Sequence, residues 1–431
     1  MTRTQDHRRE REDRRVRRAF GLLSALSALS ASSAVILSAR STQAGGLQRT
    51  NGISARGTAM GGAWCAWADD ASAVYFNPAA MDAAESQVDV GGEFVAAPRS
   101  YTPVAADGSK GDPQKTTIAS PVPTLGVIAH FYNEDAPSRV TFGAGIWNTF
   151  GGAVDYKKTG MPAIDSSEDL ALEANAGVAV RVSDRLSFGA TLRLGLGLFS
   201  TDATMNPFDA HLSASGVGVA TGLGALVRPT ENVRIGLAWR SPMHITTEGD
   251  GTVTFTSTPT SQKVRHTQNW PQEASLGIGW RAAPALRLAA QVDWAQWSQL
   301  QQIVVEFPAS PGNNQTYRED WKDTWTVRAG GEYSFGSAAV RAGAYVDTSA
   351  VPDRSIERQY YDLMKYGVSA GAGVAISGWR IDAAVDWVLP GTRTVPNNDV
   401  QTAAFPADRN IAPGTYKGTM VTAELAVGHG F

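Results

Sequence analysis

Apolar and polar residues alternate with a period of two in many segments of the chain, a pattern typical of strands with one apolar face. Between 286 and 294, leucine, alanine, valine and tryptophan alternate with arginine, alanine, glutamine and aspartate. The alternation recurs at 340–347, 379–387 and 421–427, with the charged residues almost wholly on one face. A soluble sandwich would alternate in the same way, so the pattern alone does not decide the fold.

The alternation predicts fourteen strands, an even number. They lie near residues 87–96, 124–133, 139–150, 170–183, 186–201, 210–228, 231–247, 271–283, 285–298, 321–334, 338–347, 366–376, 379–389 and 418–431.

The connections between these strands favour a barrel. With one exception, the short connections fall at one end of the bundle. The exception is 202–209, which is short although it lies at the other end. The long connections are 97–123, 151–169, 248–270, 299–320, 348–365 and 390–417. Outer-membrane barrels have short periplasmic turns and longer extracellular loops, and closure satisfies every edge hydrogen bond where lipid offers none. The sequence therefore predicts an all-β fold, a 14-stranded antiparallel transmembrane β-barrel over 87–431.

Composition is compatible with a barrel and excludes other classes. Of the 431 residues, 44 are glycine, and strand-and-turn folds tolerate this better than helical folds. A mean hydropathy of −0.19 excludes a bundle of membrane helices, whereas only every second residue of a barrel strand meets lipid. The net charge of −3 gives no support to a nucleic-acid partner. The single cysteine, Cys65, excludes an intramolecular disulfide, and we expect it to be a small buried residue.

Residues 1–44 have the pattern of a secretory signal peptide. Eight arginines lie between Met1 and Arg18, an apolar run follows at 19–39, and small residues end the segment. We expect cleavage after Ala44, a mature chain that starts at Gly45, and export to the bacterial outer membrane. A transmembrane anchor is the alternative interpretation, because the apolar run is just long enough to span.

The stretch 57–81 follows neither the leader pattern nor the strand pattern. It is rich in glycine and alanine, and Asn77 before Pro78 is a helix-start signal, because Asn caps free N–H groups and Pro fits the first helical position. These residues alone fit a compact plug, or an ordinary turn with a short surface helix. We expect a plug domain at 45–86.

The same stretch carries a resemblance to a known family. The run "ADDASAVYFNPAAM" resembles the N-terminal hatch of the FadL-type outer-membrane transporters for long-chain fatty acids and aromatic hydrocarbons. The matching positions are Ala68, Asp69, Asp70, Ala71, Asn77, Pro78 and Ala79. "GIWNTFGG" at 145–152, "RIGLAWRSPMH" at 234–244 and the segments 271–298 and 340–353 resemble later strands of that family.

The resemblance implies a function and a gating region. A hydrophobic ligand would enter the barrel, bind against a hatch inside the lumen, and leave sideways without an energy source when the mature N-terminus at Gly45 moves. The implied hatch and gating residues are Gly45, Asp69, Asp70, Asn77, Pro78 and Ala79. The implied exit is a kink in the third strand at Phe150, Gly151 and Gly152, whose other interpretation is simply the end of that strand.

The sequence departs from the family at one connection and resembles outer-membrane barrels in general at its last residue. In the fatty-acid transporters the connection matching 202–209 is longer and helps to form an outer groove that captures ligand, so this sequence does not predict such a groove. The terminal Phe431 resembles the aromatic residue by which the barrel-assembly machinery recognises outer-membrane barrels. The partners implied are a hydrophobic small molecule, outer-membrane lipid and this machinery.

No catalytic constellation stands out, so we predict no enzyme activity, cofactor or metal. The six histidines lack metal-ligand spacing, and no Gly-rich phosphate loop follows a strand. Charged residues gather on the inward faces, where Arg193 and Arg240 are candidates to bind a ligand carboxylate. The alternative is that these charges form ion pairs that brace the wall and the plug.

Two other functions stay open at this stage. The first is a structural or adhesive barrel whose plug stays shut, and the second is a water-filled porin for polar solutes. Single-channel conductance separates them from a transporter, because a porin conducts steadily whereas a plugged barrel is nearly silent.

Overall fold

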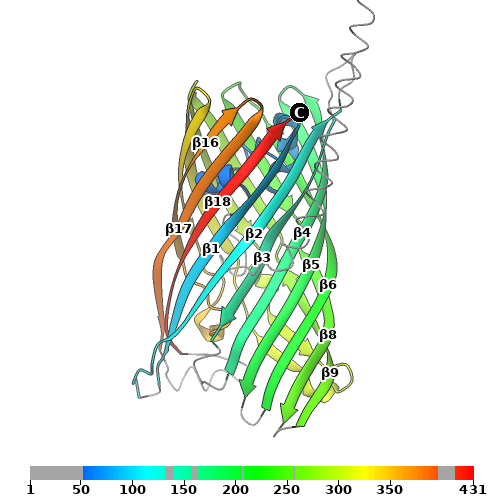
Figure 1. Ribbon diagram of the computed structural model, residues 1–431, viewed down its shortest axis with the longest axis vertical. Helices are drawn as coiled ribbons and strands as arrows, with labels where there is room; N and C mark the ends of the chain where they lie inside the picture. The colour runs from blue at the N-terminus through cyan, green and yellow to red at the C-terminus, as the bar shows by residue number, and fades with distance from the viewer. Residues whose placement is uncertain are drawn as a thin grey trace, which may run out of the picture.

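A computed structural model describes residues 52–105, 107–131, 140–156, 163–205, 208–255, 258–396 and 413–431. Fourteen antiparallel strands in these residues close into a barrel, which confirms the predicted fold (Figure 1). The barrel strands are β1 (Gln87–Pro103), β2 (Gln114–His130), β3 (Val140–Asp155), β4 (Ala163–Ser183), β5 (Leu186–Met205), β6 (Phe208–Val227), β7 (Val233–Arg240), β10 (Glu273–Ala283), β11 (Leu286–Ala295), β14 (Thr324–Phe335), β15 (Ala338–Asp347), β16 (Lys365–Ile376), β17 (Trp379–Val395) and β18 (Gly414–Gly430).

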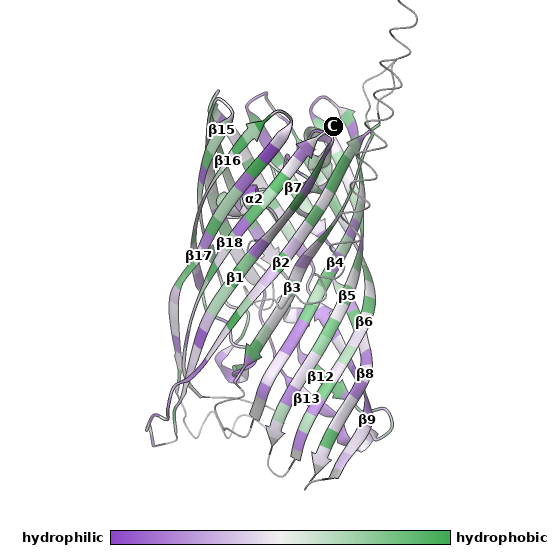
Figure 2. Cartoon of the chain, viewed as in Figure 1, coloured by the Kyte–Doolittle hydropathy of each residue, from purple (hydrophilic) through white to green (hydrophobic). Residues whose placement is uncertain are grey.

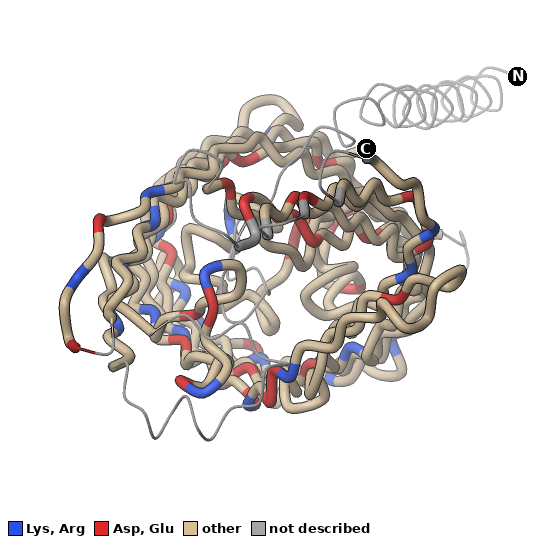
Figure 3. Tube along the Cα trace, turned by 90° about the horizontal axis from the view of Figure 1, so that it is seen from below, with Lys and Arg blue, Asp and Glu red and all other residues tan. Residues whose placement is uncertain are grey.

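The barrel closes because the first and last strands pair along their length. Gln87 of β1 lies opposite Gly430 of β18, and the register continues to Pro103 opposite Gly414. Alternate side chains point outward and inward, so hydrophobic and hydrophilic positions alternate along the strands (Figure 2). Viewed end-on, the strands form a ring with chain segments inside it (Figure 3).

Six tryptophans near the ends of the barrel strands differ in how far they are exposed. The exposed ones are Trp280, Trp325, Trp379 and Trp387. Trp239 and Trp294 are half-buried, and their indole N–H groups donate to Gln272 and Asp323. Amphipathic rings of this kind suit the boundary between lipid and water.

Two segments predicted as long connections contain strands of their own, which corrects the sequence interpretation. The barrel strands also extend into the predicted connections 97–123, 151–169 and 390–417. The segment 248–270 forms most of the hairpin of β8 (Met243–Phe255) and β9 (Thr258–Trp270), and 299–320 contains β12 (Gln302–Glu306) and β13 (Gln315–Arg318). β8 pairs with β6, and β12 pairs with β9, so the sheet extends beyond the barrel at the end with long connections (Figure 1).

The extension follows from the unequal lengths of neighbouring strands. β6 has 20 residues, whereas β7 has 8 and pairs only with the Gly222–Val227 part of β6. The Phe208–Ser215 part of β6 carries backbone donors and acceptors that need a partner, and β8 supplies it. The predicted single strand at 231–247 is therefore wrong, since the chain turns at Pro242, which has no N–H to donate.

Residues 52–86 lie inside the barrel, in the half nearer the short turns (Figure 1). They contain α2 (Ala55–Ala59), α3 (Ala73–Phe76) and the 3₁₀ helix η1 (Pro78–Ala83), and almost all of their side chains are buried. We call residues 52–86 the plug. Two wall glycines show how closely it is seated. A Cβ at Gly343 would lie 2.2 Å from the Gly61 nitrogen, and one at Gly236 would lie 2.4 Å from the Cys65 carbonyl oxygen.

The connections at the other end also fold inward. The 3₁₀ helices η2 (Trp297–Gln299), η3 (Pro311–Asn313) and η4 (Asp353–Ser355) lie in them. Trp297, Trp321, Tyr360 and Tyr361 from these connections are buried in one hydrophobic cluster with side chains of the barrel wall. Within the described ranges, no helix is both long enough and apolar enough to cross a membrane.

Candidate functional site

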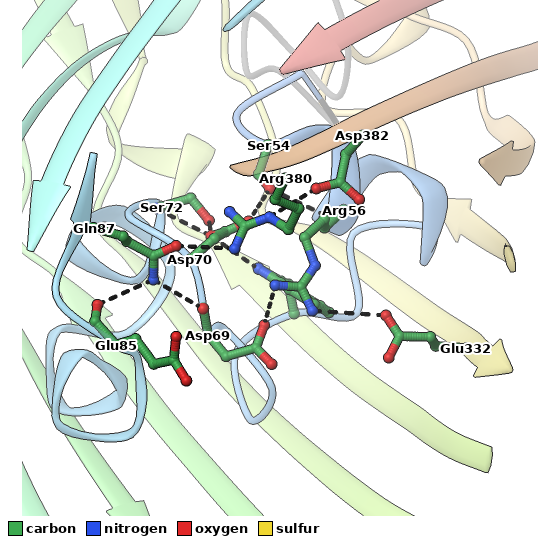
Figure 4. Close-up of polar contacts among 12 residues, drawn as sticks. Ser54, Arg56, Asp69, Asp70, Ser72, Glu85, Gln87, Glu332, Arg380 and Asp382 are labelled. Carbon is green, nitrogen blue, oxygen red and sulfur yellow. Dashed lines mark hydrogen bonds and ion pairs between the residues drawn. The ribbon is translucent and has the colours of Figure 1, made fainter. Parts of the chain in front are cut away.

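The two aspartates of the hatch motif hold the plug in different ways (Figure 4). Asp69 pairs with Arg56 of the plug at 2.7 Å and with Arg287 of β11 at 2.8 Å. Asp70 stays within the plug, where it accepts hydrogen bonds from Ser54 Oγ at 2.6 Å and from the backbone N–H of Ser72. Asp69 therefore ties the plug to the wall, whereas Asp70 ties the plug to itself.

Asn77, Pro78 and Ala79 place the start of η1 against β5 and β6. The Asn77 Oδ1 accepts from the Ala79 N–H, and Pro78 occupies the first position of the helix, as the sequence predicts. The Asn77 amide also donates to the carbonyl oxygens of Cys65 in the plug and Ala225 in β6, both at 3.1 Å. The helix is a buried 3₁₀ helix, so the interpretation as a short surface helix is wrong.

The free Cys65 is buried, as predicted. Burial raises the pKa of its thiol, and the carboxylate of Asp293 raises it further. Cys65 packs against the wall, and its N–H donates to Gln291 of β11 at 2.9 Å. This residue is a packing element of the plug.

Arg193 and Arg240 meet at one buried carboxylate, Glu173 of β4. Arg193 donates to both Glu173 oxygens, at 2.9 and 2.7 Å, and Arg240 donates to Glu173 Oε2 at 2.8 Å. Thr149 of β3 donates to Glu173 Oε1 at 2.6 Å, and the Arg240 guanidinium lies 3.9 Å from the centre of the Tyr75 ring. We call these five residues the Glu173 cluster.

The Glu173 cluster connects the plug with the predicted kink. Tyr75 belongs to α3 of the plug, and Thr149 directly precedes Phe150 in β3. The predicted arginines thus face a protein carboxylate, and their contact with a ligand carboxylate stays a prediction.

Strand β3 separates from its neighbour β2 after Ile146, before the residues of the predicted kink. β2 and β3 pair through six residue pairs that end at Leu125 and Ile146, whereas β1 pairs with β2, and β3 with β4, through fifteen each. The β3–β4 register shifts between Asn148 and Phe150, and Gly151 has φ of 151°. Residues 147–154 are buried on both faces, so this part of β3 is turned inward. We call the unpaired stretch between β2 and β3 the wall gap.

A series of ring contacts runs from the wall gap toward the long-connection end. Phe150 stacks on Trp270 with 5.1 Å between ring centres, and Trp270 lies edge-on to Trp297. Trp297 contacts Trp321 at 5.1 Å, and Trp321 contacts Tyr360 at 6.3 Å. We call these five residues the aromatic series. Trp297 and Trp321 were missed in the sequence, because they flank a long connection and no alternation assigns them a face.

Tyr360 also lines a pocket of about 350 Å³. β5 and β6 contribute Phe199 and Leu212 to it, and β12 contributes Val305. We call this cavity the outer pocket. This pocket was not predicted, since the 202–209 connection is short. It exists because β5 and β6 themselves extend past the barrel and form its wall with β8, β9, β12 and β13.

A second cavity of about 730 Å³ lies at the end with short turns. Asp82, Arg181, Arg380 and His429 line it, together with the terminal Phe431. Arg181 pairs with Asp82 of the plug at 2.8 Å. This charged lining does not suit an apolar ligand.

The remaining predictions lie outside the described residues or concern absences. Gly45 and the signal peptide 1–44 fall outside the described ranges. In the part of the chain that the structure describes, no group of three or more His, Cys, Asp or Glu side chains is placed to hold a metal ion.

Comparisons with known proteins agree with this architecture. A family model described as outer membrane protein transport protein (OMPP1/FadL/TodX) matches residues 35–423. Among curated protein sequences no match was found. At the identities below, similarity to solved structures shows a shared fold.

Three solved structures illustrate this similarity. A Pseudomonas aeruginosa FadL homologue has a TM-score of 0.77 and 16% identity, over 90% of this chain and 100% of that one. The P. putida toluene transporter TodX has a TM-score of 0.70 and 16% sequence identity, over 89% of this chain and 99% of that one. The Ralstonia pickettii toluene transporter TbuX has a TM-score of 0.66 and 17% sequence identity, over 89% of this chain and 99% of that one. Since the family model spans most of the sequence and the barrel is closed, the chain is an outer-membrane protein of the OMPP1/FadL/TodX transport family.

Proposed function

We propose that this protein moves hydrophobic compounds, such as aromatic hydrocarbons or long-chain fatty acids, passively across the outer membrane. The observation that carries the proposal is the continuity of three features: the outer pocket, the aromatic series that begins at Tyr360, and the wall gap where Phe150 ends the series. Toluene transporters of the same fold support the substrate class. The proposal involves no catalysed reaction.

The plug is proposed to be the gate. In this account 1–44 is a cleaved signal peptide, 45–86 is a hatch and 87–431 is the barrel. Movement of the mature N-terminus at Gly45 shifts Asp69, Asp70 and the segment 77–79, and the Glu173 cluster couples that shift to β3. Tyr75 and Thr149 support this coupling, because both contact members of the same buried cluster.

Release is proposed to be lateral, through the wall gap at Phe150, Gly151 and Gly152. A hydrophobic molecule that leaves through the wall enters the bilayer without crossing water, which favours this exit. The membrane lipid is then the acceptor of the ligand.

The terminal Phe431 is proposed to be the signal for the barrel-assembly machinery. Its side chain is 51% exposed at the end of β18, and its N–H donates to the Ser86 carbonyl oxygen at 3.0 Å. An exposed aromatic ring on an anchored backbone supports recognition of this residue.

Planar-bilayer conductance and mass spectrometry of co-purifying molecules test the function. We expect the intact protein to be nearly silent and to retain hydrophobic molecules. Deletion of Gly45 to Met81 removes the plug and leaves the aromatic series, so we expect it to raise the conductance above that of the intact protein. A large steady conductance in the intact protein would indicate a porin. A silent protein that neither retains nor takes up a hydrophobic compound would indicate a structural or adhesive barrel.

A further inference from the structure

Two prolines lie in the middle of β2, where a barrel strand ordinarily uses its backbone donors. Pro121 and Pro123 carry no N–H, and their side chains belong to the outward-facing series of the strand, where Pro121 is exposed and Pro123 half-buried. A proline inside a sheet removes one hydrogen bond of the ladder, so it is tolerated where the strand has no partner on that side. The effect of these two prolines therefore depends on which neighbouring strand their missing donors would face.

The carbonyl groups of β2 show which residues face which neighbour. In an antiparallel sheet the N–H and C=O of one residue point to the same neighbouring strand, and successive residues alternate between the two neighbours. The Val127 carbonyl oxygen lies 3.2 Å from the Cβ position of Gly143 on β3, whereas the Val122 carbonyl oxygen lies 3.5 Å from the Cβ position of Gly92 on β1. Odd-numbered residues of β2 thus face β3, and even-numbered residues face β1.

The missing donors of the two prolines therefore face β3, because the register of β1 and β2 runs through this part of the strand without a shift. The last residue of β2 that pairs with β3 is Leu125. Continued past that pair, the same register would bring Pro123 opposite Asn148 and Pro121 opposite Phe150. Pairing that spreads from Leu125 along the wall gap would thus lack a donor at each of its first two ladder positions.

The absence of these N–H groups also suits an edge that meets lipid. A backbone donor that faces neither a strand nor water costs free energy in hydrocarbon. An edge with free donors is also a template for pairing with another strand. At Pro121 and Pro123, β2 presents only carbonyl oxygens to the wall gap, so both costs are reduced.

Other prolines in the wall follow the same rule. Apart from Pro103, the last residue of β1, the remaining prolines of the described barrel strands are Pro98 and Pro390. Pro98 of β1 has no partner in the described register with β18, and Pro390 of β17 lies where the register with β18 shifts. Proline thus accompanies interrupted pairing, and among the described barrel strands only β2 carries it at two successive ladder positions.

We propose that Pro121 and Pro123 keep the wall gap open, because β2 lacks the donors that would join it to β3. The inward turn of β3 provides the space, and the prolines stop the ladder from closing it. The wall gap is then a fixed feature of the wall, and the plug governs whether a ligand reaches it. This inference rests on the proposed lateral release and adds the positioning residues that keep the exit open.

A double variant, Pro121→Val with Pro123→Val, restores both donors with residues that favour strands. We expect the ladder to extend past Leu125, so that the amides of β3 at 148–152 exchange with deuterium about tenfold more slowly, measured by mass spectrometry on the protein in nanodiscs. In cells, uptake of labelled propylbenzene should fall toward that of cells without the protein. Propylbenzene binding to the purified protein, measured by equilibrium dialysis, should stay unchanged.

Pro98→Val is the matched control. It is the same substitution at an exposed position on the neighbouring strand β1, but at the interruption between β1 and β18. We expect it to change neither the exchange of the β3 amides at 148–152 nor the uptake of propylbenzene.

The exchange of the β3 amides decides the inference, and uptake decides the exit. Unchanged exchange at 148–152 in the double variant overturns the inference, whatever the uptake, and so does an equal slowing in Pro98→Val. Slower exchange with unchanged uptake supports the role of the prolines and counts against lateral release. Should the double variant fail to assemble, Pro123→Ala restores only the donor next to Leu125, and the same comparison of exchange decides.

Discussion

Individual side chains in this barrel act mainly through partners that are distant in sequence. The hatch motif allowed the cap at Asn77 and the helix start at Pro78 to be predicted, because both depend on neighbouring residues. The partners of Arg193 and Arg240 were not predictable, since Glu173 lies on a different strand and alternation gives only the face of each residue. Local signals are therefore readable from sequence, whereas partners across the barrel require the register.

The fit of the plug at Gly343 leads to a stability prediction. Gly343→Ala places a Cβ against the Gly61 backbone, and overpacking of this kind costs about 1–3 kcal/mol. We expect faster hydrogen exchange in plug amides at 54–86, measured by mass spectrometry. Gly92→Ala is the control, because the nearest atom to its Cβ would lie at 3.5 Å. Equal exchange in the two variants would show that the plug is not held by this contact.

The buried Glu357 leads to a pH prediction. Its pKa is raised in the folded state, so the folded state binds more protons than the unfolded chain, and stability falls as pH rises from the unfolded pKa through the folded one. Glu357→Gln removes this loss. We expect the variant to unfold at a higher temperature than the original protein at about pH 8, and at a similar temperature at about pH 4, by circular dichroism at one scan rate. Glu306→Gln should show no such difference, and a variant that is less stable at about pH 8 would contradict the account.

Among elements, the strands of the barrel wall were predictable and the strands beyond it were not. Alternation marks a strand when one face meets lipid and the other the lumen, which is the case at 286–294. β8, β9, β12 and β13 lie beyond the barrel wall, where this contrast between lipid and lumen is absent, so period-two alternation did not mark them. Their pairing follows from the unpaired edge of β6, and strand length cannot be read from composition.

The wall gap belongs to β3 and depends on Gly151. This residue adopts a positive φ that disfavours a β-branched side chain, so Gly151→Val is expected to alter the inward turn of β3. We expect uptake of propylbenzene by cells to slow while its binding at the outer pocket stays unchanged. Gly92→Val on β1, where φ is not positive, is the control. Unchanged uptake with Gly151→Val would argue against exit through the wall gap.

At the scale of the whole molecule, the sequence predicted a closed barrel with an internal plug but not a second closure. The even strand count follows from membrane physics and is seen. The predicted alternation of connection lengths holds only in part, because β3 ends at Asp155 and β4 begins at Ala163, whereas β2 ends at His130 and β3 begins at Val140. The inward folding of Trp297, Trp321 and Tyr360 was missed, because burial of a connection depends on the space left by the plug. The lumen is therefore filled from both ends, by the plug and by the aromatic series.

Uptake is the most direct test of whether such a filled barrel serves hydrophobic molecules. Cells that produce the protein, and matched cells that do not, are supplied with labelled propylbenzene and a labelled sugar of similar mass, and the initial rates of entry are compared. The account predicts faster entry of propylbenzene with no change for the sugar. Equal propylbenzene rates in the two kinds of cell, or faster entry of the sugar alone, would contradict it.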